Sequence, residues 1–225
     1  MRLMVEDQFT GRSPAHLTVH PRDDMFLYSL ALTSTYELGV MAYFRAGMQI
    51  YDSIQQIARA QFGAAADHVK MCDFACGYGR STRFHAAALG GTNIWAGEIL
   101  PDAVAFQRDH LGVHGFHSRT DPAELELPGP FDLIFVSSLF SHLPDRTFTT
   151  WLATLHGALS ERGILVFSVH DEATMDDEHG EMPESGLAFF PVTEVADLDT
   201  ADYGATFVNE AYVRRAIEAV TGATT

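Results

Sequence analysis

Basic residues are scarce in this chain, and lysine is almost absent. Among 225 residues, 30 Asp and Glu oppose 14 Lys and Arg, which gives a formal net charge of -16, and Lys70 is the single lysine. No Lys or Arg stands between Arg162 and Arg214. DNA and RNA bind to positive surfaces that release counterions, so this charge argues against a nucleic-acid partner. We interpret the acids as a solvated surface rather than as a surface that recruits a cationic substrate.

Cysteine is also scarce, since Cys72 and Cys76 are the only two. A disulfide would need both side chains to converge across a predicted sharp bend, so we expect reduced thiols. Two cysteines this close lack the further ligands that a metal site needs. His110, His114 and His117 have ligand-like spacing but straddle a predicted helix end, a loop and a strand. We therefore predict no metal site.

Long apolar runs are missing as well. No segment approaches the length of a membrane span, and the amino terminus lacks the charged and apolar regions of a secretion signal. We expect a cytoplasmic protein without a membrane partner. A chain of this length buries about 70 to 75% of its unfolded surface in one core, which predicts one domain with an appendage.

Residues 71–80 carry the most informative pattern. A short apolar run brings Asp73 to a turn that contains Gly77 and Gly79, and helix-forming residues follow from Ser81. Glycine has no Cβ and adopts positive φ, so a ligand can lie against the main chain there. A strand, a glycine turn and a helix form the nucleotide-facing corner of an open α/β sheet.

Two classes of cofactor compete for this corner. A dinucleotide fingerprint needs a third glycine three residues after Gly79, and that position is Thr82. The acid before the turn, Asp73, is also unusual for that fingerprint. The sequence therefore weakens the nicotinamide interpretation.

The segment resembles motif I of class I S-adenosylmethionine-dependent methyltransferases, an apolar strand followed by Asp-x-Gly-Cys-Gly-x-Gly. Ala75 replaces the first glycine, and we expect it to keep a negative φ, because a left-handed alanine costs about 1 kcal/mol or more. The resemblance implies a Rossmann-like, doubly wound, mostly parallel sheet with helices on both faces. It also implies that S-adenosyl-L-methionine contacts residues of the turn, namely Asp73, Ala75, Cys76, Gly77, Gly79 and Arg80.

A second strand and helix follow at a suitable distance. Residues 93–98 predict a strand that ends in Glu98, and residues 99–108 predict a helix with Pro101 near its start. In the family, a carboxylate here accepts hydrogen bonds from both ribose hydroxyls, which gives this role to Glu98 and places Ile99 beside the cofactor. Dinucleotide folds use an acid in the same way, so Glu98 alone indicates only a nucleoside.

Residues 115–118 predict a third strand, after which Asp121 is the family's candidate to receive the adenine amino group. Asp121 followed by Pro122 is also an ordinary turn opening, and Ser118 could supply the polar contact instead. Both interpretations stay open.

The segment from Phe131 to Pro144 is the second strong match. Leu133 to Val136 is continuously apolar, as in a strand covered on both faces. The resemblance implies that the residues at its carboxyl end lie beside the cofactor, namely Ser137, Ser138 and Leu139. A helix is predicted from about 146 to 159 and a fifth strand over 163–169, preceded by a turn at Glu161-Arg162-Gly163 that lacks the family's usual proline.

The flanking regions are expected to determine substrate choice. Residues 25–32 and 38–62 predict helices, and the family resemblance implies that Tyr43 to Gly47 closes over the methionine end of the cofactor, where Arg45 could pair with its carboxylate. Residues 171–203 are acidic and rich in Gly and Pro, and we interpret them as a substrate lid. His170, at the opening of the fifth strand, and His142, past the fourth, are the candidate general bases; His142 is also an ordinary helix-entry residue.

We divide the chain into an N-terminal helical cap (1–66), a cofactor-binding core (67–170) and a lid segment with a C-terminal helix that begins near Asn209 (171–225). The sequence offers at most one of the two antiparallel strands that normally complete the family's sheet. Either the chain is part of a longer protein, or a partner such as a second copy covers an exposed sheet edge.

The sequence thus predicts in-line transfer of a methyl group to an oxygen, nitrogen or carbon atom of a small-molecule acceptor. Two rival functions remain. One is a non-catalytic scaffold or sensor that binds the same cofactor, and the other is an NAD(P)-linked oxidoreductase on a related fold.

Overall fold

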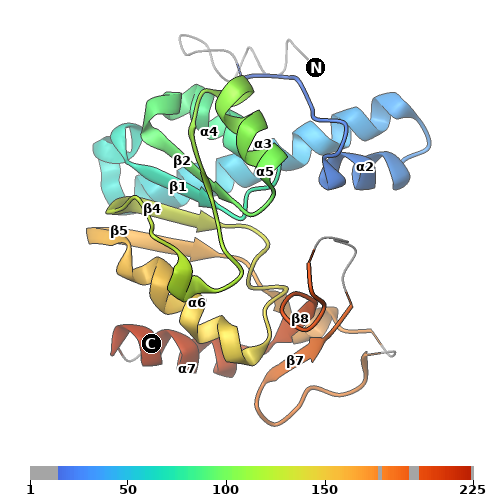
Figure 1. Cartoon of the computed structure of the whole chain (residues 1–225), viewed down its shortest axis with the longest axis vertical. Helices are drawn as coiled ribbons and strands as arrows, with labels where there is room; N and C mark the ends of the chain where they lie inside the picture. Colours follow the sequence, from blue (N-terminus) through green and yellow to red (C-terminus); the bar gives the residue numbers. More distant parts are fainter. Residues whose placement is uncertain (1–14, 177–178, 193–197, 224–225) are drawn as a thin grey trace. The chain divides into compact units, whose positions relative to one another are not determined.

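The computed structural model describes residues 15–176, 179–192 and 198–223. Two compact units make up the chain (Figure 1). The first contains the residues up to Ser118 together with Phe131–Phe135, and the second contains Arg119–Pro130 and the residues from Val136 onward.

The central sheet has five strands in the order β3-β2-β1-β4-β5. They are β1 (Met71–Phe74), β2 (Ile94–Glu98), β3 (His114–His117), β4 (Phe131–Val136) and β5 (Leu159–Phe167). β1 pairs with β2 and β2 pairs with β3 in parallel. Every residue of β1 is buried, and Leu133, Ile134 and Val136 of β4 are 0% exposed, as continuous apolar runs predict. The predicted Rossmann-like α/β fold is confirmed.

Helices of the first unit alternate with its strands. α2 (Asp24–Ala31) and the long α3 (Tyr36–Phe62) pack against one another, with N-caps from the side chains of Asp23 and Thr35 (Figure 1). A 3₁₀ turn covers Gly63–His68 and a second covers Gly91–Asn93. α4 (Thr82–Leu89) follows β1, and α5 (Pro101–Phe106) follows β2 with proline in its first turn. The helix predicted over 99–108 changes at its end into a π-helix, Gln107–Leu111.

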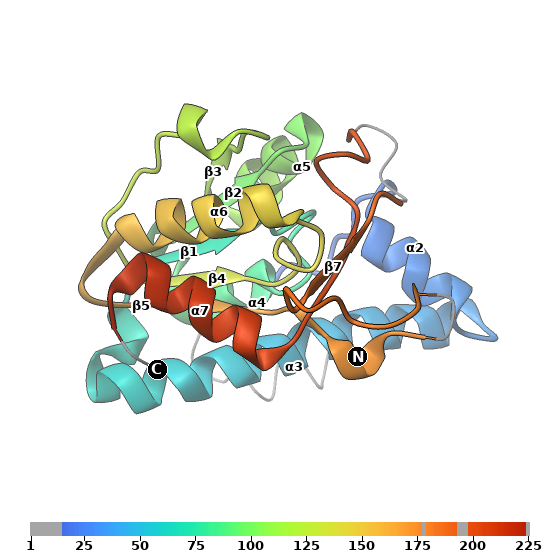
Figure 2. The ribbon, with the colours of Figure 1, turned by 90° about the horizontal axis from the view of Figure 1, so that it is seen from below.

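The second unit adds a smaller sheet. β6 (His170–Asp171) runs parallel to β8 (Ala205–Val208), and β7 (Leu187–Phe190) is antiparallel to it. α6 (Asp145–Gly157) lies beside α7 (Glu210–Thr221), as Figure 2 shows. Asn209 caps α7, so the predicted C-terminal helix is confirmed. Short 3₁₀ turns cover Pro122–Glu124 and Glu172–Thr174.

Two local predictions in this unit are wrong. The turn expected at Glu161-Arg162-Gly163 lies inside β5, which begins at Leu159. α6 ends at Gly157, with Ala158 as its C-cap. The proline that the family usually has before this strand is missing here. Since proline has no N–H to donate to a neighbouring strand, its absence allows β5 to begin directly after the cap. Residues 187–190, expected to be loop, form β7, because β8 supplies a pairing partner that local sequence does not reveal.

Lys70 lies just before β1, and its ammonium group stands over two aromatic rings. The Nζ atom is 4.5 Å from the ring centroid of Trp95 and 4.8 Å from that of Phe131. Cation–π contacts of this kind hold the cation against the sheet.

Cys72 and Cys76 are free thiols, as predicted. Among the described helices, none combines the length and apolarity needed to cross a membrane.

Candidate functional site

The turn after β1 is built from three residues with positive φ. Ala75 has a φ of 55°, Gly77 of 55° and Gly79 of 77°. The expectation that Ala75 keeps a negative φ is therefore wrong. The Ala75 amide donates to the Gly97 carbonyl at 2.8 Å, which extends the pairing of β1 with β2 and forces the chain to reverse directly afterwards. The left-handed alanine persists because the surrounding structure determines the backbone there.

Glu98, at the end of β2, holds the turn from the other side. Its Oε2 accepts from the Gly77 amide at 2.7 Å, and its Oε1 accepts from the amides of Ile99 at 2.7 Å and Leu100 at 3.1 Å. Burial raises the pKa of this carboxyl group, and the three amides oppose that shift. A carboxylate has about four acceptor positions, so part of its capacity stays available for a ligand hydroxyl.

Asp73 is fully buried beneath the turn, and one of its oxygens is unsatisfied. Its Oδ2 accepts from the hydroxyls of Thr82 at 2.7 Å and Ser81 at 3.4 Å. Its Oδ1 has no hydrogen-bond partner among the described residues. Burial raises the pKa of Asp73 to about 7. A buried acceptor without a donor is costly in isolation and suits a cationic or hydrogen-bonding ligand group.

The two glycines of the turn face different surroundings. A Cβ added to Gly77 would meet nothing within 4 Å, whereas one added to Gly79 would lie 2.5 Å from Leu111. The main chain at Gly77 is therefore open to a ligand, and Gly79 makes room for the π-helix. This pairing of an open and a packed glycine places bare backbone beside the carboxylates of Asp73 and Glu98.

Gln107, in the first position of the π-helix, was not singled out by the sequence analysis. Its Nε2 donates to the Gly77 carbonyl at 2.7 Å and to Cys76 Sγ at 2.9 Å, and the side chain is 0% exposed. Burial raises the pKa of the Cys76 thiol well above its usual range, so this sulfur stays protonated. Gln107 lies where α5 passes into the π-helix, and local sequence gives no signal for that passage.

A buried arginine on α4 ties the amino-terminal segment to the turn. Arg83 is 1% exposed and donates to the carbonyls of Gly79 at 3.0 Å, His16 at 2.9 Å and Thr18 at 2.8 Å. It also donates to the Tyr43 hydroxyl at 3.3 Å. The guanidinium group of Arg83 thus holds together two backbone segments that are distant in sequence, one before α2 and one after β1.

The segment Tyr43 to Gly47, predicted as a lid, lies in the middle of α3. Tyr43 is 0% exposed, and its hydroxyl donates to Asp23 at 2.5 Å. Gly47 allows α3 to approach the turn, since a Cβ there would lie 2.3 Å from the Arg80 carbonyl. Arg45 is exposed on the same helix. The contacts from this segment thus come from Tyr43 and Gly47, and the role of Arg45 stays a prediction.

Tyr78, inside the turn, provides a second connection to the amino-terminal segment. Its hydroxyl donates to Asp102 at 2.7 Å, and Arg22 pairs with the same carboxylate at 2.8 Å. The imidazole of His20 stacks on the Tyr78 ring at 4.5 Å and 5°. The residues before α2 therefore cover one side of the turn.

Four of the predicted cofactor residues lie in the second unit. Asp121 is exposed, and its Oδ1 accepts from the Ala123 amide at 2.9 Å, which is the turn-opening interpretation. The Ser137 carbonyl accepts from the Ser168 hydroxyl, and the Ser138 carbonyl accepts from Ser141 Oγ at 2.9 Å. Leu139 is 8% exposed. The hydroxyl groups of neighbouring serines thus fix the backbone that follows β4.

The two candidate bases, His142 and His170, also lie in the second unit, with ring centroids 6.0 Å apart. His142 Nδ1 is 2.6 Å from the Gly204 carbonyl, which can only accept, so Nδ1 carries the hydrogen and Nε2 is left as the acceptor. Tyr203 stacks on the same ring at 4.4 Å and 16°. Burial lowers the pKa of His142, which favours the neutral base. His170 is exposed.

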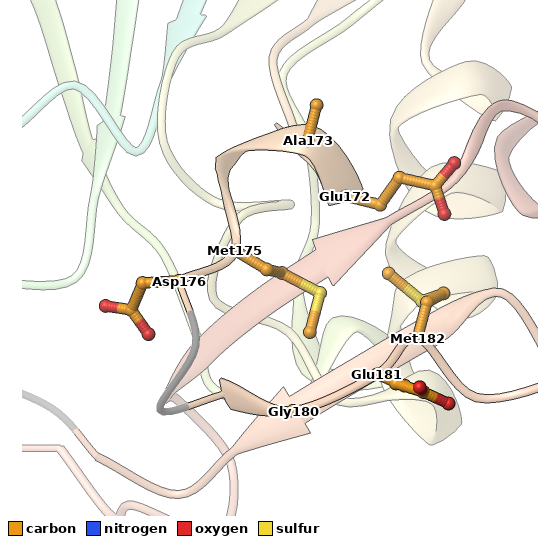
Figure 3. A pocket seen from close by; sticks show the side chains of 7 residues that line it. All are labelled: Glu172, Ala173, Met175, Asp176, Gly180, Glu181 and Met182. Atoms are coloured by element: carbon orange, nitrogen blue, oxygen red, sulfur yellow. The ribbon is translucent and has the colours of Figure 1, made fainter.

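A cavity of about 420 Å³ opens along the segment between β6 and β7 (Figure 3). Its lining residues are Glu172, Ala173, Met175, Asp176, Gly180, Glu181 and Met182. The carboxyl groups of Asp176 and Glu181 point away on opposite sides of this segment. In the part of the chain that the structure describes, no group of three or more His, Cys, Asp and Glu residues could hold a metal ion.

Comparison with known proteins identifies the fold. Residues 72–165 match the family described as Methyltransferase domain. A sugar N-methyltransferase from Streptoalloteichus sp. has a similar structure, with a TM-score of 0.58 and 13% identity over 90% of this chain and 85% of that one. So does 1,6-didemethyltoxoflavin-N1-methyltransferase from Burkholderia thailandensis, with a TM-score of 0.53 and 16% identity over 90% of this chain and 80% of that one.

A third similar structure is DesVI from Streptomyces venezuelae, with a TM-score of 0.51 and 17% identity. That match covers 71% of this chain, which spans 62% of DesVI and so less than two thirds of its length. No curated protein sequence matches the chain. These identities are low, so the structural similarity establishes the fold and leaves the acceptor open.

Proposed function

We propose that this chain, which belongs to the class I S-adenosylmethionine-dependent methyltransferases, transfers a methyl group to a small-molecule acceptor. S-adenosylmethionine supplies an electrophilic methyl group on a sulfonium when it is bound. The single observation that supports its binding here is the turn from Ala75 to Gly79, where open backbone at Gly77 stands beside Glu98 and the unsatisfied Oδ1 of Asp73.

The residues present fit that cofactor. Asp73 Oδ1 would accept from the ammonium of the methionine moiety, which would satisfy a buried carboxylate oxygen that has no donor among the described residues. Glu98 would accept from the ribose hydroxyls with the acceptor capacity that the three amides leave. Gln107 and Arg83 would keep the turn in shape without touching the ligand.

His142 is the proposed general base. Its Nδ1–H donates to Gly204, and burial keeps the ring neutral, so Nε2 can accept a proton from an acceptor O–H or N–H. When bound, S-adenosylmethionine would supply the methyl group to the acceptor atom and keep the electron pair of the broken bond on sulfur, and His142 Nε2 would take the acceptor proton. Positioning supplies most of the acceleration, of the order of 7 to 11 kcal/mol.

Calorimetric titration with S-adenosylmethionine and, separately, with NAD tests the donor. We expect the first to bind and the second not to bind, because a pyrophosphate cradle would need a glycine in place of Thr82. Binding of NAD alone would instead support the oxidoreductase. Binding of neither ligand would overturn the proposal.

Product formation separates an enzyme from a non-catalytic binding protein. Mixtures of phenols, amines and N-heterocycles are incubated with methyl-labelled S-adenosylmethionine, and label in any extracted product identifies transfer. His142→Gln should lower kcat and leave cofactor affinity unchanged, while His156→Gln, on the exposed last turn of α6, should change neither. Tight cofactor binding without any labelled product would support the scaffold or sensor.

A further inference from the structure

The small sheet of the second unit has two chemically different faces. His170 pairs with Phe207 of β8, Phe207 pairs with Ala188 of β7, and Phe190 pairs with Ala205. Paired residues share a face and neighbours along a strand alternate, so these five residues lie on one face. Leu187, Thr206 and Val208 lie on the other face and are 7%, 1% and 1% exposed.

The packed face is fixed to the segment that follows β4. Thr206 donates from its amide to the Ser141 carbonyl at 2.8 Å and from its hydroxyl to the Leu143 carbonyl at 2.7 Å. On the opposite face His170 is exposed and Phe190 is partly exposed, while Phe207 and Ala188 between them are buried, at 8% and 5% exposure. We call this face, together with His142 and His179, the histidine face.

A third imidazole, that of His179, also lies on the histidine face. The ring of His179 is 4.7 Å from Phe190 and 4.9 Å from Phe207. His170 approaches the same Phe207 ring at 5.4 Å, and His142 lies 6.0 Å from His170. Two imidazoles therefore contact the phenylalanine rings of this sheet face, and the third, His142, adjoins His170.

The orientation of two of these imidazoles follows from their partners. His179 Nδ1 is 2.5 Å from Asp176 Oδ1, and His142 Nδ1 is 2.6 Å from the Gly204 carbonyl. A carboxylate and a carbonyl only accept, so each Nδ1 carries a hydrogen, and each ring in its neutral form offers Nε2 as an acceptor. The histidine face thus combines aromatic surface with two nitrogen acceptors whose ring planes are held by neighbouring groups.

We propose that the histidine face binds the methyl acceptor, and that the acceptor is a planar aromatic compound bearing a hydroxyl or N–H group. That the bound compound is a methyl acceptor rests on the proposed function. That it is aromatic and bears a hydrogen-bond donor rests on the contacts of the histidine face. An aromatic ring packs against Phe190 edge-to-face or offset, and its hydroxyl or N–H donates to Nε2 of one of the two oriented imidazoles. His179 is a positioning residue for specificity, oriented by Asp176.

Imidazole NMR tests this directly. Protein labelled with ¹⁵N at histidine is titrated with 2-naphthol and, separately, with its saturated analogue 2-decalol, with and without S-adenosylhomocysteine. Signals are assigned with His142→Gln, His170→Gln and His179→Gln. We expect 2-naphthol to shift the Nε2 signals of His142 and His179 and to leave that of His156 unchanged, and 2-decalol to bind at least 5-fold more weakly.

Variants separate positioning from packing. His179→Gln should weaken 2-naphthol binding about 5-fold, and Asp176→Ala should do the same because the ring loses its orienting partner. Asp176→Asn keeps an acceptor oxygen for Nδ1–H and should restore most of the affinity. Unchanged binding in both His179→Gln and Asp176→Ala would overturn the role of this pair.

The outcomes also distinguish this inference from the proposed function. Cofactor binding by calorimetry with no shift of the three imidazoles at saturating 2-naphthol overturns the histidine face and leaves methyl transfer standing. Shifts of equal size with 2-decalol overturn the aromatic class. Shifts with 2-naphthol alone, in a protein that fails to bind S-adenosylmethionine, support an aromatic site on the histidine face and overturn its role as the site of a methyl acceptor.

Discussion

The turn region of the first unit and the histidine face of the second are built in opposite ways. Around the turn the polar groups are buried, with Asp73 at 0%, Thr82 at 0% and Arg83 at 1% exposure, and they are hydrogen-bonded: Thr82 donates to Asp73, and Arg83 donates mainly to main-chain carbonyls. On the histidine face the imidazoles are partly exposed and contact mainly other side chains. Substitutions around the turn should therefore lower the stability of the fold, whereas substitutions on the histidine face should change it little.

Removing Arg83 should break the first region most severely. Arg83→Leu leaves the carbonyls of His16 and Thr18 without their guanidinium donor and removes the side-chain donor of Gly79, and we expect a loss of about 3 to 5 kcal/mol in the free energy of unfolding. Urea denaturation measures it. Arg214→Leu, on the exposed face of α7, is the control and should change stability by less than about 0.5 kcal/mol. Equal effects of the two changes would contradict the comparison.

His85, on α4, should make the first region sensitive to acid. Burial lowers its pKa from 6.5 to about 3, so the unfolded chain binds the proton that the folded protein refuses. Stability from this group is complete above pH 6.5 and is lost as the pH falls toward 3. Between pH 7 and pH 5 the loss should be about 2 kcal/mol, and His85→Leu should abolish that part of the slope. An unchanged slope in the variant would assign the acid sensitivity to other groups.

Glu98 both holds the amides of the turn and is the proposed partner of the ribose hydroxyls, so its removal should affect ligand binding. Glu98→Ala should weaken adenosine binding about 10-fold or more, since hydrogen bonds to charged groups contribute about 1.5 to 3 kcal/mol. Calorimetry with adenosine and with 2′,3′-dideoxyadenosine separates two causes. A loss confined to adenosine assigns Glu98 to the ribose hydroxyls. An equal loss for both ligands assigns it to holding the Gly77 amide alone.

Ala75 offers the one change in the first region that should stabilise it. Ala75→Gly relieves a left-handed conformation that costs alanine about 1 to 2 kcal/mol, against about 0.5 to 1 kcal/mol for the extra freedom of glycine when unfolded. We expect a gain of up to about 1 kcal/mol by urea denaturation. Ala86→Gly, inside α4, is the matched control and should destabilise. A loss in both variants would show that Ala75 is not strained.

On the histidine face, the smallest effect on stability is expected. His179→Gln should change the free energy of unfolding by less than about 0.5 kcal/mol, because the ring is partly exposed and its carboxylate partner is solvated. Thermal denaturation of the variant and of the unaltered protein measures this difference. A loss as large as that of Arg83→Leu would mean that the two regions do not differ in construction.

The sequence was informative where chemistry depends on spacing along one segment. The apolar strand before Asp73, the glycines of the turn and the acid at Glu98 are all local, and the structure brings them together. The contributions of Gln107 and Arg83 could not be found in this way, because one depends on a π-helix and the other on burial against a distant segment. β7 was missed for the same reason, since its partner β8 lies outside any local window.

The contact of Lys70 with Trp95 and Phe131 makes this protein convenient for spectroscopy. With a single lysine, an amine-reactive reagent has one side-chain target, and that target touches one of only two tryptophans, Trp95 and Trp151. Acylating Lys70 removes the positive charge from above the indole, so a change in emission can be attributed to Trp95. Because Trp95 lies in β2, three residues before Glu98, an optical signal from it would report on ligand binding at the neighbouring turn without any engineered label.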